Sequence, residues 1–423
     1  MKYILLGIFL FSNIFVFSKT LRKEQIYFSL AKKRNRFFYE LEQKKSIALL
    51  LNRNIKSLKE SEIEAGLLGM QLFAYSLSQK EEKKLTEKLF LTYYKYPQKL
   101  RFRIIETCIS LSLLSCEKIA MEALLNDGNS KNFAIAADYF QKNFKLKYSK
   151  KFIQKILYKN FPNYSDIPEL FLLNNYLKKK YSEKLEKSAL LDFFSYIPEK
   201  NLWYFYSLQN ENRDFPGVLL TRKPDGKFLR DKKGNIYLQA QLARSITNVV
   251  PYLKSGNTPR GVFSIQGLHI AKSPLIGTTP AFKLFMPNEV SPSQYFHSEP
   301  YSREWSIGDY LKLIPYKYRN NLILQETFYA GKAGRDFIYS HGTGIRSAYY
   351  KGKPYYPLTP SRGCLVMEEF WNEKTGYLKK SKQLELLNLI ENSDKIKGYF
   401  YVLEFKKIPD IETIQLYAEQ SED

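Results

Sequence analysis

The feature that most constrains this chain is an abrupt change in residue pattern near Trp203. From about residue 19 to residue 200, apolar residues recur at helical spacing and runs typical of strands are almost absent. Beyond Trp203, Gly and Pro become frequent, and short β-branched or aromatic runs appear. The pattern therefore predicts two parts with different architectures, a helical half followed by a mostly β half.

The first half is predicted to be all-helical. The residues that share one helical face are Leu85, Leu89 and Tyr93; Phe133, Ala137, Phe140 and Phe144; and Leu170, Leu173, Leu177 and Tyr181. Turn-forming residues separate these segments, and we expect Ser130 and Ser165 to cap the helices that follow. The expected architecture is eight to ten helices in antiparallel pairs, arranged as a bundle or an irregular solenoid that serves as a binding or spacing platform.

The second half is predicted to be a mostly β, β-sandwich-like domain with one helix late in the chain. The expected strands lie at Gly217 to Thr221, Ile236 to Leu238, Val262 to Ile265, Asp336 to Tyr339 and Tyr399 to Phe405. The expected helix runs from Lys380 to Glu391, with Leu384, Leu387 and Ile390 on one face.

The first eighteen residues predict export. Lys2 precedes an apolar run from Ile4 to Phe17 that is too short to span a bilayer, as in a secretory signal. We expect a signal peptide over residues 1–18 with cleavage after Ser18, and an uncleaved signal anchor is the alternative. No cysteine lies near this point and no later run is long enough to cross a membrane. The mature protein is thus expected in the periplasm or cell envelope, without a transmembrane span.

The charge balance narrows the class of partner. The chain has 423 residues with 66 Lys and Arg against 42 Asp and Glu, and +16 of the net charge of +24 falls in residues 1–210. In an exported protein this excess points to anionic envelope polymers, lipid headgroups or an acidic envelope protein rather than to nucleic acid. A basic surface without a specific partner is the alternative. The 44% of hydrophobic residues excludes wholesale disorder.

Among the three histidines and three cysteines, one pair is a candidate for catalysis. His341 follows a predicted strand, and Cys364 follows Gly363, which permits a tight turn that presents the sulfur and aims backbone N–H groups at a substrate carbonyl. An imidazole is the usual base that converts a thiol into a nucleophile near neutral pH. His269 and His297 are interpreted as hydrogen-bonded loop residues, and neither a metal site nor a cofactor is expected.

The other two cysteines are interpreted as small apolar core residues. Cys108 and Cys116 lie eight residues apart on a predicted helix. At the helical rise this spacing separates them by about 12 Å, which is too far for a disulfide.

Three short motifs occur in a specific order around the candidate pair: Thr258 to Phe263, His341 to Thr343, and Ser361 to Leu365. In their order and composition they resemble the L,D-transpeptidase catalytic family, also called the YkuD-like domain, over about residues 215 to 405. The resemblance implies a catalytic domain of this type over residues 206–405. With the patterns described above, the expected division is a signal peptide (1–18), a helical domain (19–205), this catalytic domain and a C-terminal tail (406–423).

The resemblance also implies an activity in cell wall biogenesis and cell shape. Cys364 would attack the third residue of a peptidoglycan tetrapeptide stem and release D-alanine, with His341 as general base. The thioester would pass to an amine, which gives a 3→3 crosslink or protein attachment, or to water. Ser361, Gly363, Gly342 and Thr343 would support the site.

The sequence departs from the family pattern at two positions. Arg362 stands where the family often has His, and Val366 stands where it often has Arg or Asn. We hypothesise that the Arg362 guanidinium binds a stem carboxylate or holds the thiolate. Tyr339, Tyr355 and Tyr356 are candidate substrate-binding residues, with a packed aromatic loop as the alternative. An insertion before His341 is expected to form a lid, and its aromatic residues are Phe282, Phe285, Tyr295, Phe296 and Trp305.

Other Cys-His enzymes fit less well. In papain-like and NlpC-type hydrolases the cysteine precedes the histidine, sortases expect an arginine shortly after the cysteine, and a chymotrypsin-like protease would place glycine where Leu365 stands. Two alternatives remain open. One is a hydrolytic amidase or carboxypeptidase of the same fold, and the other is a non-catalytic envelope-binding protein.

Overall fold

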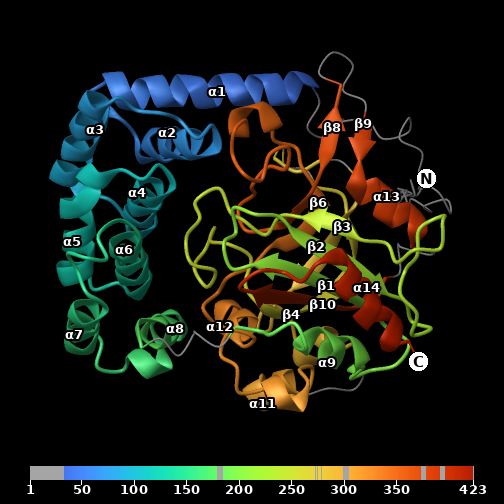
Figure 1. The fold of residues 1–423 in the computed structure, drawn as a ribbon. Helices are drawn as coiled ribbons and strands as arrows, with labels where there is room; N and C mark the ends of the chain where they lie inside the picture. The colour runs from blue at the N-terminus through green and yellow to red at the C-terminus, as the bar shows by residue number, and fades with distance from the viewer. Residues whose placement is uncertain are drawn as a thin grey trace, which may run out of the picture.

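The structure is a computed structural model that describes residues 33–178, 184–271, 273, 275–277, 279–298, 304–372, 378–390 and 396–422, with side chains from residue 40 onward in the first helix. The predicted signal segment and Tyr181 lie outside the described residues. The chain folds into a curved column of helices beside a mostly β half (Figure 1). The predicted change of architecture near Trp203 is therefore confirmed.

The described residues before Trp203 form nine α-helices, within the predicted number. They are α1 (Lys33–Asn52), α2 (Glu60–Leu72), α3 (Gln79–Thr92), α4 (Gln98–Ser110), α5 (Glu117–Asn126), α6 (Ser130–Asn143), α7 (Lys150–Asn160), α8 (Pro168–Leu177) and α9 (Ala189–Ser195). In one row, α2 contacts α4, α4 contacts α6, and α6 contacts α8. In a second row, α3 contacts α5, and α5 contacts α7. This two-row stack is an irregular solenoid, with the α2–α8 row nearer the β half (Figure 1).

The described residues of the predicted helical faces are buried except for Phe144, which is partly buried, but the predicted caps are wrong. Asn129, not Ser130, caps α6, because its side chain accepts hydrogen bonds from the backbone N–H groups of Lys131 and Asn132. The helix α8 starts at Pro168 without a side-chain cap, and Ser165 lies in a short 3₁₀ turn before it. Proline needs no cap for its missing N–H, and its fixed φ suits the first helical position.

Cys108 and Cys116 form a disulfide bond, which corrects the interpretation as unpaired core residues. The prediction assumed one continuous helix, whereas α4 ends at Ser110 and the chain reverses at Ser112, whose φ is +55°. The Leu113 N–H donates to the Cys108 carbonyl at 2.8 Å and closes the turn. The two Cα atoms therefore lie 6.1 Å apart instead of the helical separation.

The β half contains ten strands within the described residues. They are β1 (Trp203–Asn210), β2 (Gly217–Arg222), β3 (Gln239–Gln241), β4 (Gly261–His269), β5 (Ala281–Phe285), β6 (Ile338–Gly342), β7 (Leu365–Met367), β8 (Glu369–Trp371), β9 (Leu378–Ser381) and β10 (Lys397–Phe405). Eight of them form one sheet in the order β3-β2-β1-β10-β4-β5-β6-β7, and β8 pairs with β9. Four of the five predicted strands overlap β2, β4, β6 and β10, although the strand predicted from Asp336 shares only Ile338 and Tyr339 with β6. Ile236 forms only an isolated bridge before β3.

The large sheet curls until its two edges meet. Leu242, next to β3, exchanges backbone hydrogen bonds of 2.9 Å with Val366 of β7. Pairing is antiparallel except between β1 and β10 and between β6 and β7. Side chains alternate between the two faces of β10, because Phe400 and Val402 belong to the interior cluster and Tyr399 and Tyr401 to a second cluster outside it.

The β half carries more helices than the single one predicted. The predicted helix is α13 (Lys382–Leu389), and the others are α10 (Pro292–Tyr295), α11 (Ile307–Leu311), α12 (Glu326–Lys332) and α14 (Ile411–Gln420). The short helices escaped prediction because fewer than two turns show no period. The segment predicted as a tail forms α14, which packs on α9 and buries Ile414 and Ala418.

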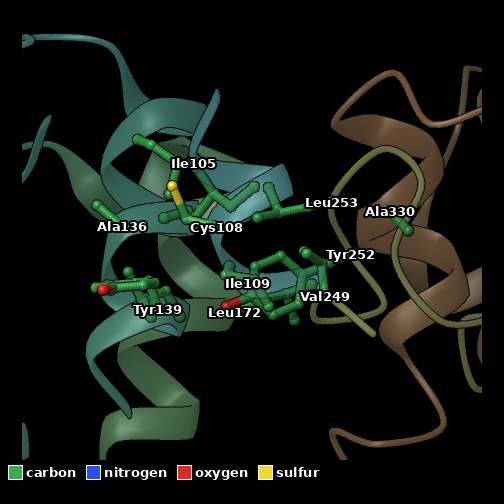
Figure 2. Close-up of a cluster of buried hydrophobic side chains, with 14 of the residues drawn as sticks. Ile105, Cys108, Ile109, Ala136, Tyr139, Leu172, Val249, Tyr252, Leu253 and Ala330 are labelled. Atoms are coloured by element: carbon green, nitrogen blue, oxygen red, sulfur yellow. The ribbon is translucent and has the colours of Figure 1, made fainter. Parts of the chain in front are cut away.

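One hydrophobic cluster runs through both halves. A loop that carries Val249, Tyr252 and Leu253 projects from the β half against α4 and α6 (Figure 2). Hydrogen bonds cross the same boundary, from Lys142 Nζ to the Asn248 carbonyl (2.5 Å) and from the Tyr350 hydroxyl to the Leu72 carbonyl (2.8 Å). The helical half is thus packed against the β half rather than held apart from it as a spacer.

Candidate active site

The three sequence motifs meet around Cys364. Thr258, from the first motif, is fully buried and donates its hydroxyl hydrogen to the Gly363 carbonyl at 2.9 Å. The second and third motifs pair as parallel strands, with Ser340 opposite Leu365 and His341 opposite Val366. Segments about 80 and 100 residues from the first motif are thereby joined in one place.

The β6–β7 register places His341 and Cys364 on the same face of the sheet. Ile338 and Leu365 point into the interior cluster. Because successive side chains alternate, Tyr339, His341 and Cys364 point to the opposite face. The side chains of His341 and Cys364, both within the described residues, do not hydrogen-bond to each other in this conformation.

The turn before Cys364 requires glycine. Gly363 has φ = +113°, and a Cβ there would lie 2.2 Å from Arg335 Nη2 and 2.7 Å from the Gly256 carbonyl. Ser361 closes the turn, since its Oγ accepts from the Gly363 N–H (3.0 Å) and donates to the Cys364 carbonyl (2.8 Å). The Gly363 N–H is therefore already hydrogen-bonded within the turn, and Gly363 supports the site through its backbone conformation.

Cys364 is the only free cysteine of the chain and is almost buried, with 7% of its surface exposed. Its thiol donates a long hydrogen bond of 3.7 Å to the Phe337 carbonyl. Burial raises the pKa of Cys364 to about 11, although the backbone N–H of Tyr339 and the charges of Arg335 and Arg362 act in the opposite direction. The resting sulfur is a neutral thiol.

Arg335 is a site residue that sequence reasoning missed. Its guanidinium is buried and donates to the carbonyls of Leu253 (3.0 Å) and Gly256 (2.7 Å), and also to that of Pro251. Burial lowers the pKa of Arg335 to about 10, so it remains cationic at neutral pH. A buried cation beside Cys364 would stabilise a thiolate once one forms. An arginine before a strand is too common to have indicated this role.

His341 is buried and held as one tautomer. Its Nδ1 lies 2.8 Å from the Gly342 carbonyl, which can only accept, so the proton is assigned to Nδ1. Its Nε2 is buried and has no hydrogen-bond partner among the described residues. Burial lowers the pKa of His341 to about 4. The residue is therefore a neutral imidazole whose Nε2 lone pair is open to accept a proton.

Gly342 leaves room for a buried carboxyl group. A Cβ at Gly342 would lie 2.1 Å from Glu369 Oε2, and Ser381 Oγ donates to the same oxygen at 2.5 Å. Burial raises the pKa of Glu369 to about 7. Thr343, by contrast, bonds to Thr359 and to the Ile345 N–H, so it braces the following loop.

The three candidate tyrosines have different surroundings. Tyr339 lies beside Cys364, and its ring stacks on His269 with centroids 5.4 Å apart. Tyr355 is only 3% exposed and lies under the Arg244 guanidinium, so it has no surface to offer a substrate and fits the packed-loop alternative. Tyr356 is 46% exposed.

The structure also shows the surroundings of Arg362, of His297 and of the insertion before His341. Arg362 Nη2 donates to Ser255 Oγ at 2.8 Å, which holds the guanidinium beside the turn. The ring of His297 lies 3.1 Å from Ser264 Oγ and 3.0 Å from the Gly398 carbonyl, as expected for a hydrogen-bonded residue. The lid expectation is wrong for three of its aromatic residues, because Phe282, Tyr295 and Phe296 are buried in the two main clusters.

Within the described parts of the chain, no group of three or more His, Cys, Asp or Glu is placed to hold a metal ion. No helix among the described residues is both long and apolar enough to cross a membrane. Comparisons of the chain with protein-family models, with curated proteins and with solved structures found no match.

Proposed function

We propose that residues 206–405 form a cysteine acyltransferase of the L,D-transpeptidase type that modifies peptidoglycan stem peptides in the cell envelope. The observation that carries the proposal is the convergence of three motifs on one turn. Cys364 and His341 share a face of the β6–β7 pair, with an unpartnered Nε2 on His341 and the buried Arg335 cation beside the sulfur.

The proposed reaction has two steps, acylation of Cys364 and transfer of the acyl group to an acceptor amine. Cys364 Sγ attacks the carbonyl carbon of the third stem residue as its proton passes to His341 Nε2. The bond to the terminal D-alanine breaks, and its nitrogen takes that proton and leaves as an amine. An acceptor amine then attacks the thioester and gives its proton to His341, which returns it to the sulfur.

The resting protonation states agree with a base that acts during attack. With a thiol pKa of about 11 and an imidazole pKa of about 4, the proton stays on sulfur until the substrate is bound. Transfer becomes favourable as the S–C bond forms, because the attacking sulfur then loses its proton affinity. The Arg335 charge favours the same direction.

The Cys108–Cys116 disulfide supports the export part of the proposal. Disulfides form and persist in oxidising compartments and are rare in the cytosol. Peptidoglycan is assembled outside the cytoplasmic membrane, so the proposed compartment and the proposed substrate agree.

The test is to incubate the full-length protein and its Cys364→Ala variant with tetrapeptide muropeptides and to analyse the products by mass spectrometry. Crosslinked dimers that lack one D-alanine are the expected product, and they should disappear in the variant. Tripeptides without dimers would assign the hydrolytic alternative. Equal, unchanged mixtures with both proteins would overturn the enzymatic proposal and leave an envelope-binding protein.

A second variant tests the base. His341→Gln keeps a neutral polar side chain but cannot accept the thiol proton, and we expect turnover to fall by about 10²-fold or more. His297→Gln is the matched control, because it replaces a histidine that contacts Ser264 and Gly398 and leaves Cys364 and His341 in place.

A further inference from the structure

We propose that a basic cavity between the two halves binds a carboxylate-bearing part of the acyl-donor peptide, so that the helical half completes the substrate site. This inference rests on the proposed function. The cavity has a volume of about 510 Å³. Its cationic lining comes from α4 (Lys99, Arg103) and α6 (Lys131) on one side and from Lys254, Arg335 and Arg362 on the other.

The charge of this cavity is strongly one-sided. Among the described residues that line it, six side chains are cationic and the single carboxylate is Glu64. Glu64 pairs with Lys99 at 3.1 Å and lies 3.7 Å from Arg103. Two carboxylates outside the lining also take part, because Arg103 pairs with Glu106 and Lys254 lies 3.7 Å from Asp336. Such a wall attracts an anion, because low-dielectric surroundings focus its positive potential.

Two of these cations are held by carbonyl groups, which do not neutralise them. Lys131 Nζ donates to the Ala333 carbonyl across the boundary at 2.8 Å, and Arg335 donates to three loop carbonyls. Neither side chain has a carboxylate partner among the described residues. A carboxylate in the cavity would supply the missing counter-charge, and arginine is well suited to hold it.

The cavity adjoins the nucleophile. Arg335 lines it and also lies against Gly363, where a Cβ would approach its Nη2 to 2.2 Å. Arg362 lines it from the residue before Gly363, and both charges act on the Cys364 thiol. An anion bound here would therefore lie beside the turn that presents Cys364.

The size favours a peptide segment over a polymer chain. A volume of about 510 Å³ falls within the range of small-ligand sites. The wall is also rigid, because the disulfide closes the turn after α4 and Lys131 ties α6 to the β half. These features suit a preformed site that fixes one end of a substrate.

The test measures binding without turnover. The probe is a tetrapeptide muropeptide titrated into full-length Cys364→Ala protein by calorimetry, alongside the same peptide with its carboxylates amidated. In Lys99→Gln/Lys254→Gln, whose altered side chains are 78% and 69% exposed and so tolerate substitution, we expect Kd for the acidic peptide to rise at least about tenfold. Amidation should cause a similar loss in the parent and little further loss in this variant.

A matched control is Lys45→Gln/Lys317→Gln. These lysines are 60% and 70% exposed and pair with Glu42 and Asp192, as Lys99 pairs with Glu64, but they do not line the cavity. Their removal should leave Kd unchanged. The affinity of the parent should also weaken with added salt, as expected for charge pairing.

The outcomes separate this inference from the proposed function. Equal Kd values for all three proteins would overturn the cavity inference, even if muropeptides are crosslinked. If peptide binding depends on these charges but the parent protein turns over no muropeptide, the cavity inference stands and the proposed enzymatic function is overturned. Indifference to amidation combined with full competition by inorganic phosphate would overturn the carboxylate ligand in favour of a phosphate-bearing one.

Discussion

At the scale of single residues, the site is defined by what burial does to two titrating groups. The Cys364 thiol and the His341 imidazole are both buried, and burial disfavours the charged form of each. At rest, Cys364 and His341 are therefore a neutral thiol and a neutral imidazole rather than a thiolate–imidazolium pair. The Arg335 charge offsets part of the cost and would matter most once sulfur loses its proton.

The alkylation rate of Cys364 by iodoacetamide tests this picture. Because the thiol pKa is raised to about 11, the rate should climb about tenfold per pH unit from pH 7 to pH 10. Since Cys108 and Cys116 are bonded to each other, the oxidised protein reports on this thiol alone. Stopped-flow or mass-spectrometric rates would measure it, and a plateau between pH 5 and pH 8 would show a preformed thiolate instead.

The sequence indicated some of these residues and missed others. Cys364, His341 and Gly363 were predicted because their residue types and order carry a chemical meaning. Arg335 and Glu369 were missed, because each acts through a contact with a backbone that lies far from it in sequence. The disulfide was missed because the spacing argument assumed a helix that ends early.

At the scale of elements, the strand β4 is anchored by a buried ion network that starts in the first motif. Arg260 pairs with Glu326 through two hydrogen bonds and with Glu404 at 2.6 Å, and Arg213 also binds Glu404. Burial alone would raise the pKa of Glu404, but Arg260, Arg213 and Lys184 lower it to about 2. The network joins β4 to α12 and β10.

Glu404→Gln should destabilise the protein by about 3–5 kcal/mol at pH 7, because it leaves buried arginines without their counter-charge. The folded-state pKa of Glu404 is depressed, so its stabilisation is present above pH 4.5 and is lost as the pH falls from about 4.5 towards 2. Urea unfolding at pH 7 and pH 3 would measure both effects.

The exposed pair Lys382–Glu385 supplies the control for this prediction. Glu385→Gln should change stability by less than about 0.5 kcal/mol, since Glu385 is 44% exposed. Equal losses from the two substitutions, or an unchanged acid sensitivity in Glu404→Gln, would contradict the proposed weight of the buried network.

At the scale of the whole molecule, the two halves behave as one packed body. The interior cluster includes Ile105 and Ile109 of α4 together with Val249 and Leu253 of the β half (Figure 2). The sequence predicted the helical half as a binding or spacing platform. The basic residues of α4 and α6 instead line a cavity that Arg362, in the turn before Cys364, also lines.

Removal of the helical half should therefore damage the β half. A chain of residues 184–423 would expose Val249, Leu253 and Tyr350, and we expect it to aggregate or to unfold well below the full chain. Size-exclusion chromatography and thermal unfolding would measure this, with the full chain as control. A soluble monomer with the stability of the full chain would show that the halves are independent.

The sequence alone indicated the division near Trp203, the helical first half, the strands β2, β4, β6 and β10, and the candidate pair His341 and Cys364. It did so because hydrophobic period and turn chemistry are local properties that each segment carries with it. The tertiary structure decided how the sheet closes between β3 and β7, that Arg335 lies beside Cys364, and that α4 and α6 wall a basic cavity next to it. These features depend on packing between segments remote in the chain, and no local pattern records such contacts.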